Sequence, residues 1–213
     1  VWYHRNCLKI FGITVEQVGS PSAHKPCLFV SNHCSYLDIP VISSLMPISF
    51  VAKAEVNNWP LFGTLARLQG TLFIDRRLSK VNEGQTALAK RLDAGDSLML
   101  FPEGTSSDGT RVLPFRRALL QTALDQAGSG KLVIQPVSIV CTSMLGLPAD
   151  RSDRQVYAWF GDMDLLPHLW AYCNIRTSTI RVTFHEPIDV ASMSDRAVLA
   201  NTAENLVAQG IAA

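Results

Sequence analysis

The stretch Cys27-Leu28-Phe29-Val30-Ser31-Asn32-His33-Cys34-Ser35-Tyr36-Leu37-Asp38 passes from an apolar run directly into polar residues. Residues 27–31 predict a buried strand, because a short continuous apolar run is typical of a strand covered on both faces. Such strands occur in parallel sheets packed between helices. The stretch therefore favours an α/β protein in which polar residues follow a buried strand.

Strand patterns and helix patterns alternate along the rest of the chain. The expected strands are residues 14–18, 27–31, 48–52, 70–74, 97–101, 132–140, 157–160 and 179–184. The expected helices are residues 2–12, 40–45, 60–68, 81–94, 117–127 and 197–209. This alternation predicts an α/β fold with a mostly parallel central sheet flanked by helices. Because the sequence shows no repeat and no linker, we expect residues 1–213 to form a single domain.

Composition excludes some classes of protein. Of the 213 residues, 47% are hydrophobic and 17% are charged, which is typical of a globular chain rather than a disordered one. A net charge of +1 gives no general attraction to nucleic acid, so we expect no nucleic-acid partner.

Five scattered cysteines without a C-x-x-C pair argue against a disulfide framework or a zinc site, and they fit a reducing compartment. The longest apolar stretches, 37–51 and 132–148, are interrupted by prolines and by polar residues and are too short to span a bilayer. The chain begins at Val1 rather than methionine, which leaves room for an N-terminal membrane anchor that this sequence does not contain.

Polar residues follow expected strands at three places: Asn32-His33 with Asp38, Asp75-Arg76-Arg77, and Glu103-Gly104-Thr105. In open α/β sheets, ligands bind outside the carboxyl ends of the strands, where such residues converge. The pattern predicts one shared site.

His33 and Asp38 allow two interpretations. In the first, Ser35 and Asp38 form a capping box at the start of a helix, and His33 is an ordinary polar loop residue. In the second, His33 is a general base, and Asp38 fixes its tautomer and stabilises the imidazolium. Residues five apart cannot share one face of an ideal helix, so the second interpretation requires the intervening residues to form a turn into the helix.

The other polar segments also have two interpretations. Arg76 is either a solvated surface arginine or a group that binds an anionic head group through two parallel hydrogen bonds. Glu103 either belongs to a simple turn or holds hydroxyl groups or Arg76. Covalent catalysis by Cys34 is disfavoured, because adjacent residues rarely face each other and no activating cation is evident. His168 is expected on a helix surface.

Four segments together resemble the 1-acylglycerol-3-phosphate acyltransferase family, within the wider glycerolipid and lysophospholipid acyltransferases. They are Asn32-His33-Cys34-Ser35-Tyr36-Leu37-Asp38, Gly70-Thr71-Leu72-Phe73-Ile74-Asp75-Arg76-Arg77, Phe101-Pro102-Glu103-Gly104-Thr105 and Val133-Ile134-Gln135-Pro136-Val137-Ser138. They occur in the family's order and cover residues 27–140. Because four motifs in order are far more specific than one, the resemblance strongly favours a catalytic His33.

The resemblance implies that the protein transfers a fatty acyl group from acyl-CoA or acyl carrier protein to a lysophospholipid hydroxyl. His33 and Asp38 would be catalytic, Arg76 would contact the acceptor phosphate, and Glu103, Gly104 and Thr105 would shape the acceptor site. It implies no metal and no cofactor beyond the thioester co-substrate. We expect a role in phospholipid biosynthesis at the cytoplasmic face of a membrane, the bacterial inner membrane.

The acceptor expected from this resemblance is 1-acylglycerol-3-phosphate, which would become phosphatidate. The alternative acceptor is lyso-ornithine lipid, because residues 157–170 resemble bacterial members that act on either lipid. Two other classes stay open: a thioester or ester hydrolase, which lacks a G-x-S-x-G motif here, and a non-catalytic lipid-binding protein.

Residues 1–12 contain interfacial aromatics, apolar side chains, and the basic Arg5 and Lys9. This composition is typical of a helix that lies on a membrane surface. A helix packed on the domain's own core fits the same residues.

Overall fold

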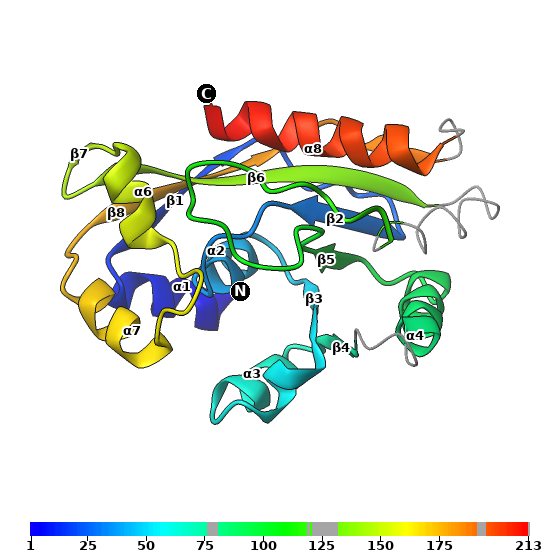
Figure 1. Cartoon of the computed structure of the whole chain (residues 1–213), viewed down its shortest axis with the longest axis horizontal. Helices are drawn as coiled ribbons and strands as arrows, with labels where there is room; N and C mark the ends of the chain where they lie inside the picture. The colour runs from blue at the N-terminus through cyan, green and yellow to red at the C-terminus, as the bar shows by residue number, and fades with distance from the viewer. Residues whose placement is uncertain (76–80, 119, 121–131, 191–194, 213) are drawn as a thin grey trace.

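Strand β2 (Cys27–Ser31) lies inside the sheet, between β6 (Val133–Met144) and β5 (Leu98–Leu100). The computed structural model describes residues 1–75, 81–118, 120, 132–190 and 195–212 (Figure 1). Within these residues the strand order is β1-β8-β6-β2-β5-β3-β4. The remaining bounds are β1 (Ile13–Val18), β8 (Ser178–Phe184), β3 (Ser49–Lys53), β4 (Leu72–Ile74), β7 (Leu147–Pro148) and β9 (Ile188–Asp189).

Most strand pairs in this sheet are parallel, as the sequence predicts. Parallel pairs run continuously from β6 through β2, β5 and β3 to β4, and β1 also pairs with β8 in parallel. The exception is β6, which pairs antiparallel with β8, β7 and β9. The carboxyl ends of β2, β5, β3 and β4 therefore meet at one edge, where the sequence places its polar residues.

Two hydrophobic clusters cover the two faces of the sheet. All five residues of β2 are buried, and alternate side chains enter opposite clusters: Cys27 and Phe29 on one side, Leu28 and Val30 on the other. The first cluster includes residues of α1 (Trp2–Ile10) and α2 (Asp38–Leu45), and the second includes residues of α4 (Val81–Asp93) and α8 (Arg196–Ala212). Figure 1 shows α8 on one side of the sheet and α1 with α2 on the other. The described residues form a single α/β domain.

The remaining helices are η1 (Ala54–Asn58), α3 (Phe62–Leu68), α6 (Arg151–Tyr157) and α7 (Leu165–Cys173). Most predicted elements appear within two or three residues of their expected bounds. The predicted helix 117–127 lies mostly outside the described residues, as does Arg76.

The strand predicted at residues 157–160 is wrong. Tyr157 is instead the last residue of α6, and residues 158–160 have no regular secondary structure. Asp150 starts this helix with a capping box: its side chain accepts from the Asp153 N–H, and the Asp153 side chain accepts from the Asp150 N–H. This local capping signal outweighs the apolar run from which the strand was predicted.

Candidate active site

His33 and Asp38 meet at the carboxyl end of β2. His33 Nδ1 lies 2.8 Å from Asp38 Oδ2. The intervening residues form a turn, in which Asp38 N–H donates to the Ser35 carbonyl at 3.0 Å, and α2 begins at Asp38. This turn is the condition that the sequence sets for contact between residues five positions apart.

The Asp38 carboxylate contacts both the backbone of its own loop and the imidazole of His33. Asp38 Oδ2 accepts the backbone N–H groups of Cys34 at 2.9 Å and Ser35 at 3.0 Å, in addition to facing His33. The contact with Ser35 N–H is one half of the expected capping box, but α2 begins at Asp38 with Leu37 as its N-cap, so the expectation that Ser35 is the N-cap is wrong. The other half is absent, because the Ser35 hydroxyl accepts from Leu37 N–H instead of Asp38 N–H. Asp38 therefore orders the loop and orients the histidine at the same time.

Asp38 is fully buried, and its second oxygen also has partners. Tyr157 Oη donates to Oδ1 at 2.8 Å, and Cys34 Sγ lies 3.7 Å from the same atom. The sequence predicts Tyr157 in a strand and does not indicate it as a site residue. The capping signal of Asp150 and Asp153 could have placed Tyr157 at the end of a helix, but no sequence pattern links it to Asp38.

His33 is held on three sides. Its ring stacks on Phe101, with centroids 4.2 Å apart and an interplanar angle of 19°. The backbone N–H of His33 donates to Glu103 Oε2 at 3.2 Å, and the backbone carbonyl of His33 accepts from Ser107 N–H at 2.8 Å. The side chain remains 21% exposed. Because Nδ1 faces Asp38, Nε2 is the ring nitrogen that can exchange a proton with a bound molecule.

Glu103, Gly104 and Thr105 follow β5, the neighbour of β2. Glu103 is only 2% exposed, and its other oxygen accepts from Leu113 N–H at 2.9 Å. Burial raises the pKa of Glu103 to about 8. Gly104 adopts a left-handed φ of 74°, which favours glycine, and Thr105 is exposed. The structure thus places the buried Glu103 next to the backbone of His33, and it places Thr105 at the surface of the same loop.

Cys34 is a poor candidate for a nucleophile. It is buried, and burial together with the nearby Asp38 carboxylate raises the pKa of its thiol well above the ordinary value. A thiol must be deprotonated to attack an acyl group. The structure therefore supports the expectation that Cys34 does not act covalently.

Aromatic side chains surround Tyr36, which lies in the loop between His33 and Asp38. Tyr36 makes edge-to-face contacts with Phe62 of α3, Trp159 and His168 of α7. Its hydroxyl lies 2.9 Å from His168 Nδ1, so His168 is half-buried against this loop rather than fully on the helix surface. These contacts attach α3 and α7 to the loop that carries the candidate site.

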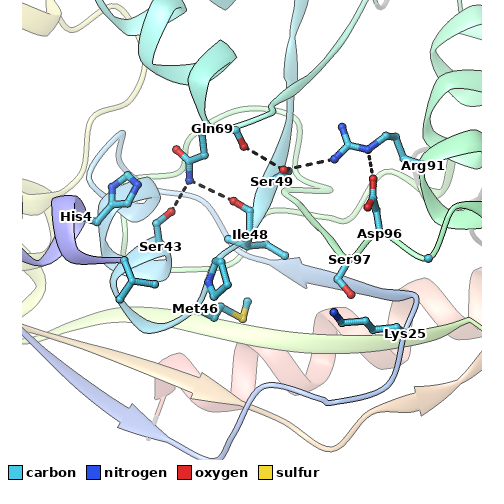
Figure 2. A pocket seen from close by; sticks show the side chains of 13 residues that line it. His4, Lys25, Ser43, Met46, Ile48, Ser49, Gln69, Arg91, Asp96 and Ser97 are labelled. Carbon is cyan, nitrogen blue, oxygen red and sulfur yellow. Dashed lines mark hydrogen bonds and ion pairs between the residues drawn. The ribbon is translucent and has the colours of Figure 1, made fainter.

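A separate cavity of about 440 Å³ lies at the opposite edge of the sheet (Figure 2). Its lining includes Lys25, Ser49 and Ser97, which lie at or before the amino ends of β2, β3 and β5. Arg91 forms an ion pair with Asp96 there. Because β2 extends roughly 3.3 Å per residue, its five residues separate this cavity from His33. The cavity is therefore distinct from the candidate active site.

The described residues hold no group of three or more histidine, cysteine or acidic side chains arranged to bind a metal ion. Among them, no helix combines the length and hydrophobicity needed to cross a membrane.

A family model described as "Acyltransferase" matches residues 12–140. Together with the relatives below, this match shows that the chain belongs to the acyltransferase family. It is 41% identical, over 97% of this chain and 79% of the relative, to the lyso-ornithine lipid O-acyltransferase of Brucella abortus. It is 34% identical to the 1-acyl-sn-glycerol-3-phosphate acyltransferase of Neisseria meningitidis serogroup B, over 95% of this chain and 76% of the relative.

A solved structure has the same fold. The 1-acyl-sn-glycerophosphate (LPA) acyltransferase PlsC from Thermotoga maritima aligns with a TM-score of 0.68 at 24% identity, covering 98% of this chain and 75% of that one. This likeness confirms the expected α/β architecture with its mostly parallel sheet.

Proposed function

We propose that this acyltransferase moves a fatty acyl group from a thioester donor, acyl-CoA or acyl carrier protein, to the hydroxyl of lyso-ornithine lipid. The observation that carries the chemistry is the 2.8 Å contact between His33 Nδ1 and the buried Asp38 Oδ2 beside a partly exposed imidazole. A histidine oriented in this way is suited to remove a proton from a hydroxyl group.

In the proposed reaction, His33 Nε2 takes the proton of the acceptor hydroxyl as its oxygen attacks the thioester carbonyl carbon. Asp38 stabilises the imidazolium that forms. The tetrahedral intermediate then breaks its carbon–sulfur bond, and the imidazolium returns its proton to the leaving thiolate. The products are the acylated lipid and the free thiol, and the enzyme regains its initial protonation state. No metal or redox cofactor takes part in the proposed steps.

The relatives favour lyso-ornithine lipid over the 1-acylglycerol-3-phosphate expected first. Relatives named lyso-ornithine lipid O-acyltransferase are 41% identical in Brucella abortus and 36% identical in Rhizobium meliloti, against 34% for the Neisseria meningitidis 1-acyl-sn-glycerol-3-phosphate acyltransferase. Lysophosphatidate is the second candidate acceptor, because the 1-acyl-sn-glycerol-3-phosphate acyltransferases of Neisseria align with nearly the whole length of this chain.

We assign Arg76 to an anionic group of the acceptor, either the phosphate of lysophosphatidate or the carboxylate of ornithine. Glu103, Gly104 and Thr105 form the loop beside His33 that would bound the acceptor site. In this arrangement Glu103 would fix the position of His33 by accepting its backbone N–H, while the exposed Thr105 would face the lipid.

We expect purified protein to transfer a palmitoyl group from palmitoyl-CoA to lyso-ornithine lipid with a kcat/KM at least about tenfold above that for lysophosphatidate.

Arg76→Gln should lower kcat/KM roughly 10- to 150-fold with both anionic acceptors, because it removes a charged hydrogen-bonded contact. The loss should be much smaller with uncharged monoacylglycerol. Transfer is measured by thin-layer chromatography of labelled product.

The same assay separates the rival functions. Arg77→Gln is the matched control, and it should cost less than Arg76→Gln. Release of free palmitate without acylated lipid would identify a hydrolase, and lipid binding without turnover would identify a binding protein. Equal losses with charged and uncharged acceptors would assign Arg76 to the fold or to the donor instead.

We also propose that the enzyme works at a membrane surface, the cytoplasmic face of a bacterial inner membrane. Moving a sixteen-carbon chain into water costs roughly 12 kcal/mol, at about 0.8 kcal/mol for each methylene. Two helices that contact the Tyr36 loop carry exposed apolar residues: Leu166 and Trp170 on α7, and Leu68 on α3. Farther from His33, α1 also exposes Trp2, Tyr3 and Ile10. An active site beside such a surface could receive its lipid without exposing the chain to water.

Helix α1 packs on the domain and also leaves an aromatic side chain exposed. Leu8 is buried in the core, and Arg5 Nε donates to the Ser44 carbonyl at 2.9 Å, so this helix packs on the domain. Trp2 remains 79% exposed on it, and Trp170 of α7 is 77% exposed. Because Leu8 is part of the core, point substitutions test the membrane role better than deletion of residues 1–12.

Combined substitution of Trp2→Ser and Trp170→Ser should weaken binding to phosphatidylglycerol vesicles about 100-fold or more, since each indole buried in the interface contributes roughly 1.5–3 kcal/mol. Vesicle sedimentation measures the change. Leu147→Ser is the control, because Leu147 is equally apolar and exposed but lies on β7. Unchanged binding of the double variant would clear these residues, and no binding by the wild type would refute vesicle attachment through this chain.

A further inference from the structure

The carboxylate of Asp38 is held at both oxygens, and the two oxygens have different partners. Oδ2 faces His33 Nδ1 and the N–H groups of Cys34 and Ser35, all of which lie within the same local loop. Oδ1 accepts a hydrogen bond of 2.8 Å from the hydroxyl of Tyr157, which lies 119 positions away in the sequence. Tyr157 is fully buried, so water does not compete for this contact.

A second contact ties the segment around Tyr157 to the same loop. Trp159 N–H donates to the Cys34 carbonyl at 2.7 Å, and Cys34 directly follows His33. Two connections, one through a side chain and one through the backbone, therefore link the end of α6 to the turn between His33 and Asp38. The matching family model ends at residue 140, so this segment lies outside it.

Tyr157 can only donate in this contact. Burial, with the Asp38 carboxylate next to it, raises the pKa of Tyr157 well above its ordinary value, so the hydroxyl stays protonated. A carboxylate accepts this proton donor through Oδ1 while Oδ2 continues to accept from His33.

We propose that Tyr157 is a positioning residue of the acyl-transfer site, whose hydroxyl fixes the Asp38 carboxylate so that Oδ2 stays aligned with His33 Nδ1. This inference rests on the proposed role of His33 as the general base. Tyr157, Asp38 and His33 would then form one hydrogen-bonded chain, with only His33 contacting the reacting groups.

Removing the hydroxyl should have two consequences. The carboxylate loses its strong partner on Oδ1 and can rotate, which loosens the orientation of the imidazole. It also keeps more of its negative charge density for His33, which stabilises the imidazolium. The first effect lowers the maximal rate, and the second shifts the pH at which the histidine becomes an effective base.

Tyr157→Phe should therefore reduce kcat for palmitoyl transfer roughly 3- to 30-fold, with little change in KM for the acceptor. The acidic limb of the kcat/KM profile should move to higher pH by about half a unit. These measurements use the full chain with palmitoyl-CoA and lyso-ornithine lipid, or lysophosphatidate if that acceptor is preferred.

Tyr172→Phe is the matched control. Tyr172 is equally buried, packs edge-to-face against Tyr157 at 5.9 Å, and donates to or accepts from Ser178 Oγ at 2.8 Å, but it does not touch Asp38. It should lose similar stability without moving the acidic limb. Other titratable groups near the pair, Cys34, Glu103 and Cys141, are common to both variants, so the comparison isolates the Tyr157 hydroxyl.

A further variant keeps the hydroxyl if Tyr157→Phe fails to fold. Replacement of Tyr157 by 3-fluorotyrosine makes the hydroxyl a stronger donor, and it should move the acidic limb to lower pH. The inference would be overturned if His33→Ala is inactive and the acidic limb stays unchanged in Tyr157→Phe or in the fluorinated variant. Full activity of His33→Ala would instead overturn the proposed function itself.

Discussion

His33→Ala should remove nearly all acyl transfer while the protein stays folded. A positioned general base contributes about 10²–10⁴-fold to a rate, and the imidazole of His33 is a partly exposed group at this site. The fold should survive, because Asp38 keeps the N–H groups of Cys34 and Ser35 and the Tyr157 hydroxyl after the imidazole is gone. The lost stacking on Phe101 should cost only modest stability.

The measurement is turnover of labelled palmitoyl-CoA, with circular dichroism and thermal unfolding as checks on the fold. His24→Ala is the control, since His24 is exposed in the loop before β2 and should leave turnover unchanged. If folded His33→Ala retained more than about a tenth of wild-type turnover, His33 would not be the general base.

Asp38→Asn should cost less activity than His33→Ala but should also destabilise the protein. An asparagine can keep its carbonyl oxygen toward His33 and turn its amide toward the Tyr157 hydroxyl, so the shape of the site survives. It loses the charge that stabilises the imidazolium, and we expect a drop in kcat of about 10²-fold. Because charged hydrogen bonds to backbone N–H groups become neutral ones, unfolding should become easier by about 1.5–3 kcal/mol.

Urea unfolding and kcat measured on the same sample test both parts of this prediction. Asp93→Asn is the control, because Asp93 is exposed at the end of α4. Wild-type activity in Asp38→Asn would remove Asp38 from the mechanism. A larger loss than in His33→Ala would show that its main role is to hold the loop.

Much of the fold could be predicted because its determinants are local. The continuous apolar run of β2 predicts a strand buried on both faces, and the structure buries every residue of it. The position of β2 inside a mostly parallel sheet then brings Glu103, which follows β5, next to His33. The strand predicted at residues 157–160 is wrong, because the capping box of Asp150 and Asp153 starts a helix that ends at Tyr157.

The sequence by itself determined where the candidate site lies and that His33 and Asp38 could meet, because strand burial and a five-residue turn depend on neighbouring residues. Only the tertiary structure decided what surrounds this pair. Glu103 holds the backbone of His33, and the Tyr157 hydroxyl reaches Asp38 across 119 positions. The first contact follows from the pairing of β2 with β5, and the second from the packing of α6 beside the sheet. No periodicity or spacing along the chain encodes the packing of α6.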